Sequence, residues 1–286
     1  MSETYALSGT GVWSGLLRFG DAAEIAALAT ELEELGYSAL WIPDTGGDVF
    51  GPLANLLGAT KAATIATGIL NIWMHTPEET AAQHAALTTE HGHRFLCGIG
   101  VSHRPFIDHV NEPGTYQRPV EKVAEFLDGL DAAGTPLARA DRCIAALGPK
   151  MLELAKTRTA GTHPYLVTPE HTQRARESIG PDALVACEQG VVLETDAGKA
   201  RDIARTHLKT YLGLPNYTNN WKRIGFTDDD LADGGSDRLV DALVAWGDES
   251  AIVARVKAHR DAGADHVCIQ ALEADPRTMP AGQLRT

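Results

Sequence analysis

Residues 21–42 read DAAEIAALATELEELGYSALWI, and this stretch decides the fold. Its first part places apolar residues at helical spacing on one face. Gly36 is suited to end that helix, and Ala39–Ile42 is a short apolar run typical of a buried strand. The same order of helix, glycine and strand recurs at residues 248–269. The repetition indicates helices that alternate with parallel strands.

The same alternation can be followed along the rest of the chain. Strands are predicted at residues 7–13, 38–43, 65–72, 95–101, 142–147, 162–167, 183–193 and 265–271. Helices are predicted at residues 21–35, 51–63, 77–91, 116–133, 149–157, 169–179, 196–212 and 249–262. Buried strands and helices in this order predict an α/β fold, a closed (β/α)8 TIM barrel.

The barrel is expected to be a single domain over residues 1–286, with a helical insertion at about 213–248. Long irregular segments in barrels are often lids over the active end, although a helical pair packed on the side of the barrel fits the sequence equally well.

An open, doubly wound sheet is the alternative architecture. Its dinucleotide-binding form normally shows a GxGxxG motif after the first strand. Here Gly98 and Gly100 belong to the fourth predicted strand, and His103 stands where the third glycine is expected. The dinucleotide-binding pattern is therefore not matched.

Composition and charge exclude several classes of protein. The 286 residues are 44% hydrophobic and carry a formal charge of −13, which argues against a nucleic-acid-binding surface but permits a local basic pocket. Met1–Thr4 has no basic n-region, and no run of about 18 apolar residues occurs, so we expect neither a secretory signal nor a membrane span. Cys97, Cys143, Cys187 and Cys268 are far apart in strand-like stretches, and buried free thiols in a cytoplasmic protein are expected.

Active sites of (β/α)8 enzymes lie at the C-terminal ends of the strands. Asp44 and Glu188 are the carboxylates predicted there, and His103 is suited to act as an acid near neutral pH. Ser14, Ser102 and Cys187 are nucleophiles by position, but no Gly-x-Ser-x-Gly elbow accompanies them. The pair His91 and His93 precedes a strand and so points to the opposite end of the barrel, and no metal site is expected.

Two glycine-containing stretches suit a flat, phosphorylated ligand. The glycines at residues 98–102 allow a ring to lie against the backbone, or they relieve crowding inside the barrel. Gly148-Pro149-Lys150 opens a helix whose free N–H groups and lysine form a credible anion site, although Gly-Pro also starts helices for purely structural reasons.

Taken in order, several stretches resemble the luciferase-like monooxygenase family, and within it the coenzyme F(420)-dependent (deazaflavin) oxidoreductases of actinobacterial type. The matching stretches span nearly the whole chain and are LGYSALWIPD at 35–44, ATGIL at 66–70, HRFLCGIG at 93–100, AALGPKM at 145–151 and DAGADHV at 261–267.

The resemblance implies a (β/α)8 barrel that holds F(420), or alternatively FMN, over the strand ends. It implies a non-prolyl cis peptide at about Gly68-Ile69 and a homodimer. F(420) carries a polyglutamate tail, and the candidates for binding this tail are Arg18, Arg104 and Lys150. The implied cofactor-binding residues are Gly68, Ile69, Leu70, Asn71, Gly100, Val101 and Ser102 for the ring, and Gly148, Pro149, Lys150, Gly161, Thr162 and His163 for the phosphate.

The chain departs from this family at two positions. Several deazaflavin dehydrogenases have an acid followed by histidine after the second strand, where this chain has Asp44-Thr45, and His103 replaces a further frequent acid. Sugar-phosphate chemistry is therefore not expected. We expect Asp44 and His103 to be catalytic in hydride transfer between F(420) and a small, largely apolar organic substrate. The alternatives are an FMN-dependent monooxygenase and a cofactor-binding protein without turnover.

Overall fold

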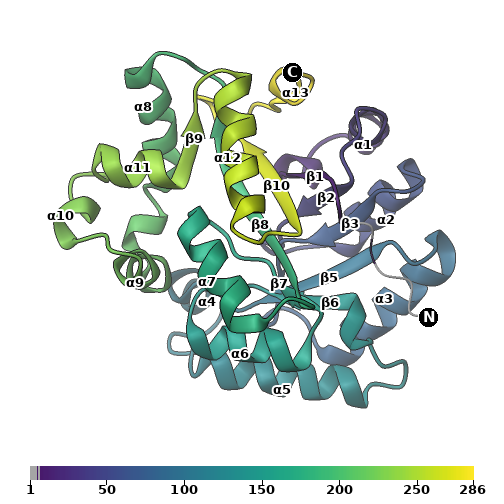
Figure 1. Ribbon diagram of the computed structural model, residues 1–286. Coiled ribbons are helices and arrows are strands. Elements are labelled where there is room, and N and C mark those ends of the chain that lie inside the picture. Colours follow the sequence, from purple (N-terminus) through teal and green to yellow (C-terminus); the bar gives the residue numbers. More distant parts are fainter. Residues whose placement is uncertain (1–4, 6) are drawn as a thin grey trace.

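Parallel strands surrounded by helices close into a barrel, as Figure 1 shows. The computed structural model describes residue 5 and residues 7–286. Around the barrel the order is β1, β2, β3 with β4, β5, β6, β7, β8 and β10, and β10 pairs with β1 to close the circle. The predicted (β/α)8 architecture is confirmed. The expectation that no secretory signal is present rests on Met1–Thr4, which lie outside the described residues.

The strands are short and almost entirely buried, as expected for a parallel barrel covered by helices. They are β1 (Thr10–Trp13), β2 (Ala39–Ile42), β3 (Thr64–Thr67), β4 (Leu70–Asn71), β5 (Phe95–Gly100), β6 (Arg142–Ile144), β7 (Gly161–Thr162), β8 (Leu184–Val192), β9 (Val244–Trp246) and β10 (His266–Ala271).

Helices begin where the capping residues of the sequence predict. The Thr76 and Thr168 side chains accept hydrogen bonds from the N–H groups of Glu79 and His171, each just before a proline at the first helical position. The helices are α1 (Ala22–Glu34), α2 (Phe50–Ala59), α3 (Pro77–His91), α4 (Arg104–Val110), α5 (Pro119–Ala132), α6 (Pro149–Arg158), α7 (Pro169–Ile179), α8 (Ala197–Leu208), α9 (Pro215–Arg223), α10 (Asp228–Leu231), α11 (Asp237–Leu243), α12 (Glu249–Asp261) and α13 (Ala281–Leu284), with 3-10 turns η1 (Gly15–Leu17), η2 (Arg139–Asp141) and η3 (Tyr211–Gly213).

The third strand of the barrel differs from its prediction because it is split into β3 and β4. The peptide bond between them, Gly68-Ile69, is cis, as the family resemblance implies. Beside it, a Cβ on Gly98 would collide with the Thr67 carbonyl oxygen. Of the two interpretations of this glycine, relief of crowding inside the barrel therefore explains Gly98.

Other elements also differ from the prediction. The strand predicted at 162–167 is paired only at Gly161–Thr162, and the helix predicted at 196–212 ends at Leu208. The short strand β9 was not predicted, and it pairs with the C-terminal part of β8. It lies outside the closed circle of strands.

Three groups of buried side chains hold the elements together. One group lies inside the barrel and includes Trp13, Trp41 and Leu96, and a larger one joins the strands to the surrounding helices. A third group joins α8, α9, α11 and β9, the elements that lie together in green in Figure 1. The Trp221 indole N–H of α9 donates to the Leu166 carbonyl oxygen at 3.1 Å, which fixes this segment against the loop after β7.

The four cysteines are free and buried, as expected. Burial raises the pKa of Cys97 and of Cys187 to about 12, so both stay as unreactive thiols at neutral pH. Among the described residues, no helix combines the length and apolar character that crossing a bilayer requires.

Candidate functional site

Leu70, Asn71 and Gly100 lie side by side at the C-terminal ends of the strands. Leu70 pairs with Ile99 and Asn71 pairs with Gly100. A Cβ on Gly100 would lie 2.6 Å from the Ile69 side chain, so a glycine is required here. Val101 and Ser102 follow directly, and Ser102 has a positive φ of 52°. The residues predicted to bed the cofactor ring therefore lie on two neighbouring backbone segments, 68–71 and 100–102, which pair side by side.

Gly68 is enclosed by Trp13 and His163. The Trp13 indole N–H donates to the Gly68 carbonyl oxygen at 3.0 Å, and a Cβ on Gly68 would lie 2.9 Å from His163 Nε2. The two predicted residues are thus brought together, with Trp13 as a third member that the sequence analysis did not include in the site.

The His163 imidazole presents a free acceptor atom. His163 Nδ1 lies 2.8 Å from the Ala186 carbonyl oxygen, which can only accept, so the proton is on Nδ1. Burial lowers the pKa of His163 to about 4, and the ring is neutral at pH 7. His163 Nε2 is buried and has no partner among the described residues. It is available to an N–H or O–H group of a ligand.

Gly161 and Thr162 serve the barrel wall. A Cβ on Gly161 would collide with the Leu184 backbone, and Thr162 Oγ1 donates to the Ile144 carbonyl oxygen at 3.1 Å. These two residues hold β7 between β6 and β8 and bring His163 to the barrel interior.

The N-terminus of α6 faces a group of cations. Gly148 is its N-cap without a side-chain cap, Pro149 is the first helical residue, and Lys150 follows. A Cβ on Gly148 would lie 3.7 Å from the Arg223 guanidinium of α9, and Arg174 donates to the Arg223 carbonyl oxygen at 2.6 Å. Among the described residues, no salt bridge engages these three basic side chains. Pro149 has no N–H, and the Met151 N–H donates to the Gly148 carbonyl oxygen at 3.1 Å, so it is mainly these cations at a helix N-terminus that favour an anion such as a phosphate.

Arg18 is not available to a ligand tail. Arg18 follows η1 and is buried against the loop after β2. Its guanidinium donates there to the Pro43, Gly46, Gly47 and Asp48 carbonyl oxygens and to Asp44. The expectation that Arg18 lies at the mouth of the site is therefore corrected.

Asp44 is buried, and both of its oxygens are fully engaged. Oδ1 accepts from Arg18 at 3.3 Å and from the Gly46 N–H at 3.1 Å, while Oδ2 accepts from the Asn71 N–H at 3.1 Å and from His75 Nε2 at 2.9 Å. Burial alone would raise the pKa of Asp44, but the hydrogen bonds from His75 and from the two backbone N–H groups outweigh it and lower this pKa. Asp44 is an ionised side chain that holds its neighbours in place.

Asp44 is not followed by a histidine in the sequence, but the fold brings His75 next to it and so forms an acid–histidine pair. The hydrogen bond to Asp44 raises the pKa of His75, although burial opposes the shift. His75 stands among the strand-end residues of the sequence, but it is distant from Asp44 along the chain and no pattern in the sequence connects the two.

His103 lies against the segment that follows β8. Its ring centre is 5.6 Å from that of Tyr217 and 6.2 Å from that of Tyr211. Burial lowers the pKa of His103, so the ring is mostly neutral at pH 7, and its buried Nδ1 has no partner among the described residues. No described residue engages this nitrogen of His103, and the catalytic role of His103 stays a prediction.

A polar cluster around Tyr165 was missed by the sequence analysis. The Tyr165 hydroxyl donates to Gln270 Oε1 at 2.7 Å and accepts from the Tyr211 hydroxyl at 3.2 Å, while His207 Nε2 lies 3.3 Å away. The Tyr165 ring is 5.2 Å from that of Trp13. The cluster connects the barrel interior to α8 and η3.

Glu188 of β8 belongs to the same region and is fully buried. Its Oε2 accepts from the Leu166 N–H at 3.0 Å, whereas its Oε1 has no partner among the described residues. Burial raises the pKa of Glu188 to about 8, so this carboxyl is mostly protonated at pH 7.

The unpartnered polar atoms provide a test of whether this end of the barrel suits a bound cofactor. Among the described residues, eleven buried side-chain atoms lack a hydrogen-bond partner, and four of them are Asn71 Nδ2, His103 Nδ1, His163 Nε2 and Glu188 Oε1. Buried polar groups in proteins are nearly always paired. Four such atoms near the same strand ends fit a ligand that carries several polar groups, as flavins and deazaflavins do.

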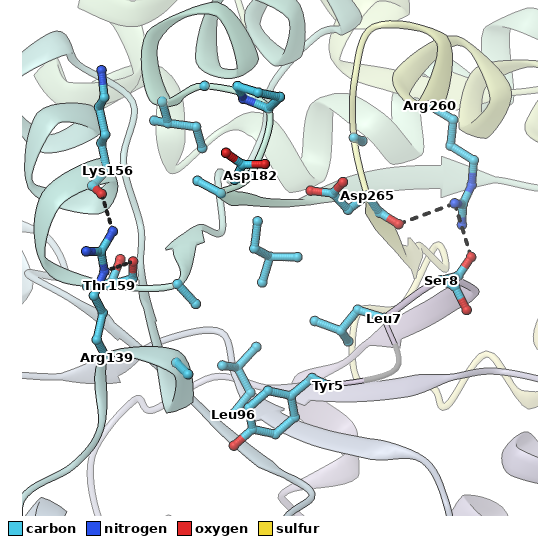
Figure 2. A pocket seen from close by; sticks show the side chains of 18 residues that line it. Tyr5, Leu7, Ser8, Leu96, Arg139, Lys156, Thr159, Asp182, Arg260 and Asp265 are labelled. Carbon is cyan, nitrogen blue, oxygen red and sulfur yellow. Dashed lines mark hydrogen bonds between the residues drawn. The ribbon is translucent and has the colours of Figure 1, made fainter. Parts of the chain in front are cut away.

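A cavity of about 1280 Å³ lies at the opposite end, among the N-terminal ends of the strands (Figure 2). The two arginines labelled in Figure 2 are engaged by the backbone: Arg139 donates to the Lys156 and Thr159 carbonyl oxygens, and Arg260 donates to that of Ser8. Active sites of (β/α)8 enzymes lie at the other end, so this cavity is not the candidate active site.

Among the described residues, no group of three or more His, Cys, Asp or Glu side chains is arranged to hold a metal ion. His93 instead pairs with Asp141 at 2.6 Å.

The chain matches a sequence family described as luciferase-like monooxygenase over residues 4–266. No curated protein sequence matches it significantly. The F(420)-dependent tetrahydromethanopterin reductase from Methanopyrus kandleri is similar in structure, with a TM-score of 0.75, 18% identity, and 98% of this chain and 97% of that chain covered. An F(420)-dependent secondary alcohol dehydrogenase, solved with an F(420)-acetone adduct, has a TM-score of 0.73 at 13% identity. The match covers 96% of this chain and 98% of that enzyme's chain. The oxygenating constituent of 3,6-diketocamphane monooxygenase from Pseudomonas putida, in complex with FMN, has a TM-score of 0.66 at 14% identity, with 98% and 95% covered.

Proposed function

Because the chain belongs to the luciferase-like monooxygenase family, we propose that it is an F(420)-dependent oxidoreductase that transfers a hydride between this cofactor and a small organic substrate. The observation that carries the proposal is the cationic N-terminus of α6, where Gly148 faces the unpaired Arg223 guanidinium. An acidic protein that gathers unpaired cations at the active end of a barrel is suited to a phosphate-bearing cofactor.

The residues would divide the cofactor between them by chemistry. The backbone at Gly68–Asn71 and at Gly100–Ser102 would bed the ring, and Asn71 Nδ2 and His163 Nε2 would meet its polar edge. Lys150 at the N-terminus of α6, together with Arg223 beside Gly148, would hold the phosphate, and Pro149 would fix the start of the helix. When bound, the deazaflavin supplies a carbon that accepts or donates a hydride.

We prefer F(420) over FMN because the quoted sequence stretches resemble the F(420)-dependent branch of the family. Two F(420)-dependent enzymes are also among the structures of similar fold. The FMN-bound monooxygenase supports the second candidate, an FMN-dependent monooxygenase of the same fold. The deazaflavin reacts poorly with oxygen, whereas reduced FMN permits oxygen insertion, so the cofactor decides the reaction class.

The substrate would enter between the barrel and the segment after β8. Trp13, Tyr165 and Tyr211 pack together there with ring centres 5.2 and 5.5 Å apart. Aromatic walls of this kind favour a small, largely apolar molecule. We also propose a homodimer, which light scattering at micromolar concentration would refute by giving the mass of one 30.5 kDa chain.

The proposal is tested by calorimetric titration of the purified protein with oxidised F(420) and with FMN in parallel. Micromolar binding of F(420), with FMN much weaker, is the expected result. Binding of FMN alone would transfer the protein to the monooxygenases, and oxygen uptake with reduced FMN would then be measured. Binding of neither would contradict both functions.

A further inference from the structure

Glu188 carries an unused proton inside the barrel. In a protonated carboxyl group, the carbonyl-type oxygen accepts hydrogen bonds and the hydroxyl oxygen donates one. Because the Leu166 N–H donates to Oε2, Oε2 is the accepting oxygen and the proton belongs on Oε1. Oε1 is buried and has no partner among the described residues. A buried O–H donor without an acceptor is costly, so its position favours a ligand that brings one.

Glu188 Oε1 lies on the side of the residue that is nearer to the C-terminal end of β8. A Cβ on Gly190, two residues further along β8 on the same face, would lie 3.7 Å from Oε1. Residues two apart on a strand share one face, so Glu188 and Gly190 lie on the same face of β8. The Val244 and Leu272 side chains approach the same position at 3.5 and 3.6 Å, so Oε1 lies against Gly190 in apolar surroundings on the C-terminal side of Glu188.

The groups that face Glu188 are uncharged at neutral pH. Tyr165 from the loop after β7, Tyr211 from η3, Tyr217 from α9, and Cys268 from β10 all have pKa values raised by burial. Burial lowers the pKa of His163 and of His207 to about 4, so both imidazoles are neutral as well. Because no cation among the described residues stabilises a carboxylate here, the neutral acid is the resting form of Glu188.

We propose that Glu188 is the proton donor of the reaction, and that the substrate therefore carries a carbonyl group or, in the reverse direction, a hydroxyl group. This inference rests on the proposed function, because the hydride must come from the reduced deazaflavin.

The step balances in atoms and electrons. The carbonyl carbon accepts the hydride, with its two electrons, and forms a new C–H bond while the carbonyl π bond breaks. The carbonyl oxygen takes the proton from Glu188 Oε1 and becomes a hydroxyl. The deazaflavin is left oxidised, and the Glu188 carboxylate regains a proton from solvent before the next turnover. In the reverse direction the carboxylate accepts the alcohol proton.

Infrared difference spectroscopy of the protein without cofactor tests whether Glu188 holds the proton. The control variant is Glu194→Gln, the same substitution just beyond the end of β8 and accessible to solvent. The wild type and Glu194→Gln are expected to show the carbonyl band of a protonated carboxyl at pH 7, and Glu188→Gln is expected to lack it. Adding oxidised F(420) with 2-propanol, cyclohexanol or another simple alcohol is expected to shift the band.

Kinetics with reduced F(420) and acetone or cyclohexanone as probes then test the role of the proton. Glu188→Gln is expected to lower kcat by 10²-fold or more while cofactor affinity changes less than twofold, because general acids contribute about 10²–10⁴-fold. Glu194→Gln is expected to leave both unchanged.

A missing band, a band that remains in Glu188→Gln, or a band that no probe shifts although calorimetry shows F(420) to be bound would overturn the assignment. Equal kcat in the two variants would do the same. Failure of F(420) to bind by calorimetry would instead remove the proposed function without altering the band, so the two failures are distinguishable.

Discussion

Two buried carboxyl groups in the active half of the barrel, Asp44 and Glu188, have opposite surroundings. Asp44 accepts four hydrogen bonds, two of them from the basic side chains of Arg18 and His75. Glu188 accepts one hydrogen bond, from a backbone N–H, and faces aromatic rings and thiols. The pKa of Asp44 is lowered and that of Glu188 is raised to about 8.

The difference shows how one barrel end can hold both an anion and an acid at pH 7. Groups whose environments drive their pKa values apart are those that divide acid and base roles in enzymes. Here the ionised member, Asp44, has no free acceptor position, so its role is to fix Arg18, His75 and the start of β4. The neutral member, Glu188, keeps a free oxygen. Four substitutions test this contrast, from the largest expected effect to the smallest.

Asp44→Ala is expected to lower the free energy of unfolding by about 3–5 kcal/mol, because it removes the buried carboxylate that neutralises Arg18 and pairs with His75. Urea unfolding monitored by circular dichroism measures the loss. In the wild type, the stability that Asp44 provides is present above its unfolded pKa and is lost as pH falls through its lower folded pKa. A loss below about 1 kcal/mol would mean that Asp44 does not organise this region.

Glu188→Gln is expected to change the pH dependence of stability. The folded pKa of about 8 lies above the unfolded value of 4.5, so wild-type stability is fully present below pH 4.5 and decreases as pH rises toward 8. Glutamine cannot ionise, and the variant should gain about 3 kcal/mol over the wild type between pH 5 and pH 8. Urea unfolding at the two pH values measures this gain. Parallel curves for the wild type and the variant would show that Glu188 is ionised throughout.

His75→Gln is expected to cost about 1–2 kcal/mol at pH 6, because Asp44 loses a charged donor but keeps Arg18 and two backbone N–H groups. The pKa of His75 is raised, so its stabilisation is complete below its unfolded pKa and declines as pH increases through its folded pKa. The difference between the variant and the wild type should therefore shrink in alkaline buffer. A difference that grows with pH would contradict the Asp44–His75 pair.

Tyr165→Phe is expected to have the smallest effect, a loss of about 1 kcal/mol, because one hydroxyl with two hydrogen bonds is removed while the ring packing stays. Thermal unfolding measures it, with Tyr37→Phe as a control, since the Tyr37 hydroxyl makes a single bond to the Leu284 carbonyl oxygen. A loss several times larger for Tyr165→Phe would mean that the cluster also supports the neutral form of Glu188.

The alternation of helices and strands was sufficient to predict the closed barrel from the sequence. Helical periodicity and short apolar runs are local signals, and Gly36 and Thr76 mark helix ends by their own chemistry. The strand predicted at residues 162–167 was too long. Its later residues, such as Leu166, are buried but do not pair with a neighbouring strand. Hydrophobicity reports burial, whereas strand length depends on pairing partners.

The candidate site was predictable only where backbone chemistry marks it. The glycines at positions 68, 100 and 148 stand where a side chain would collide or where a helix begins, and the sequence shows them directly. The pairing of Asp44 with His75, and the approach of Arg223 to Gly148, join residues from distant elements. A single sequence carries no signal for such contacts, so neither could be predicted from it.

A crystal structure of the protein with oxidised F(420) tests the central claim most directly. The account predicts the deazaflavin ring against Leu70 and Gly100, the phosphate at Gly148 beside Arg223, and Glu188 Oε1 facing the space next to the ring. A cofactor bound in the cavity among the N-terminal ends of the strands, or one whose phosphate does not approach α6, would contradict it.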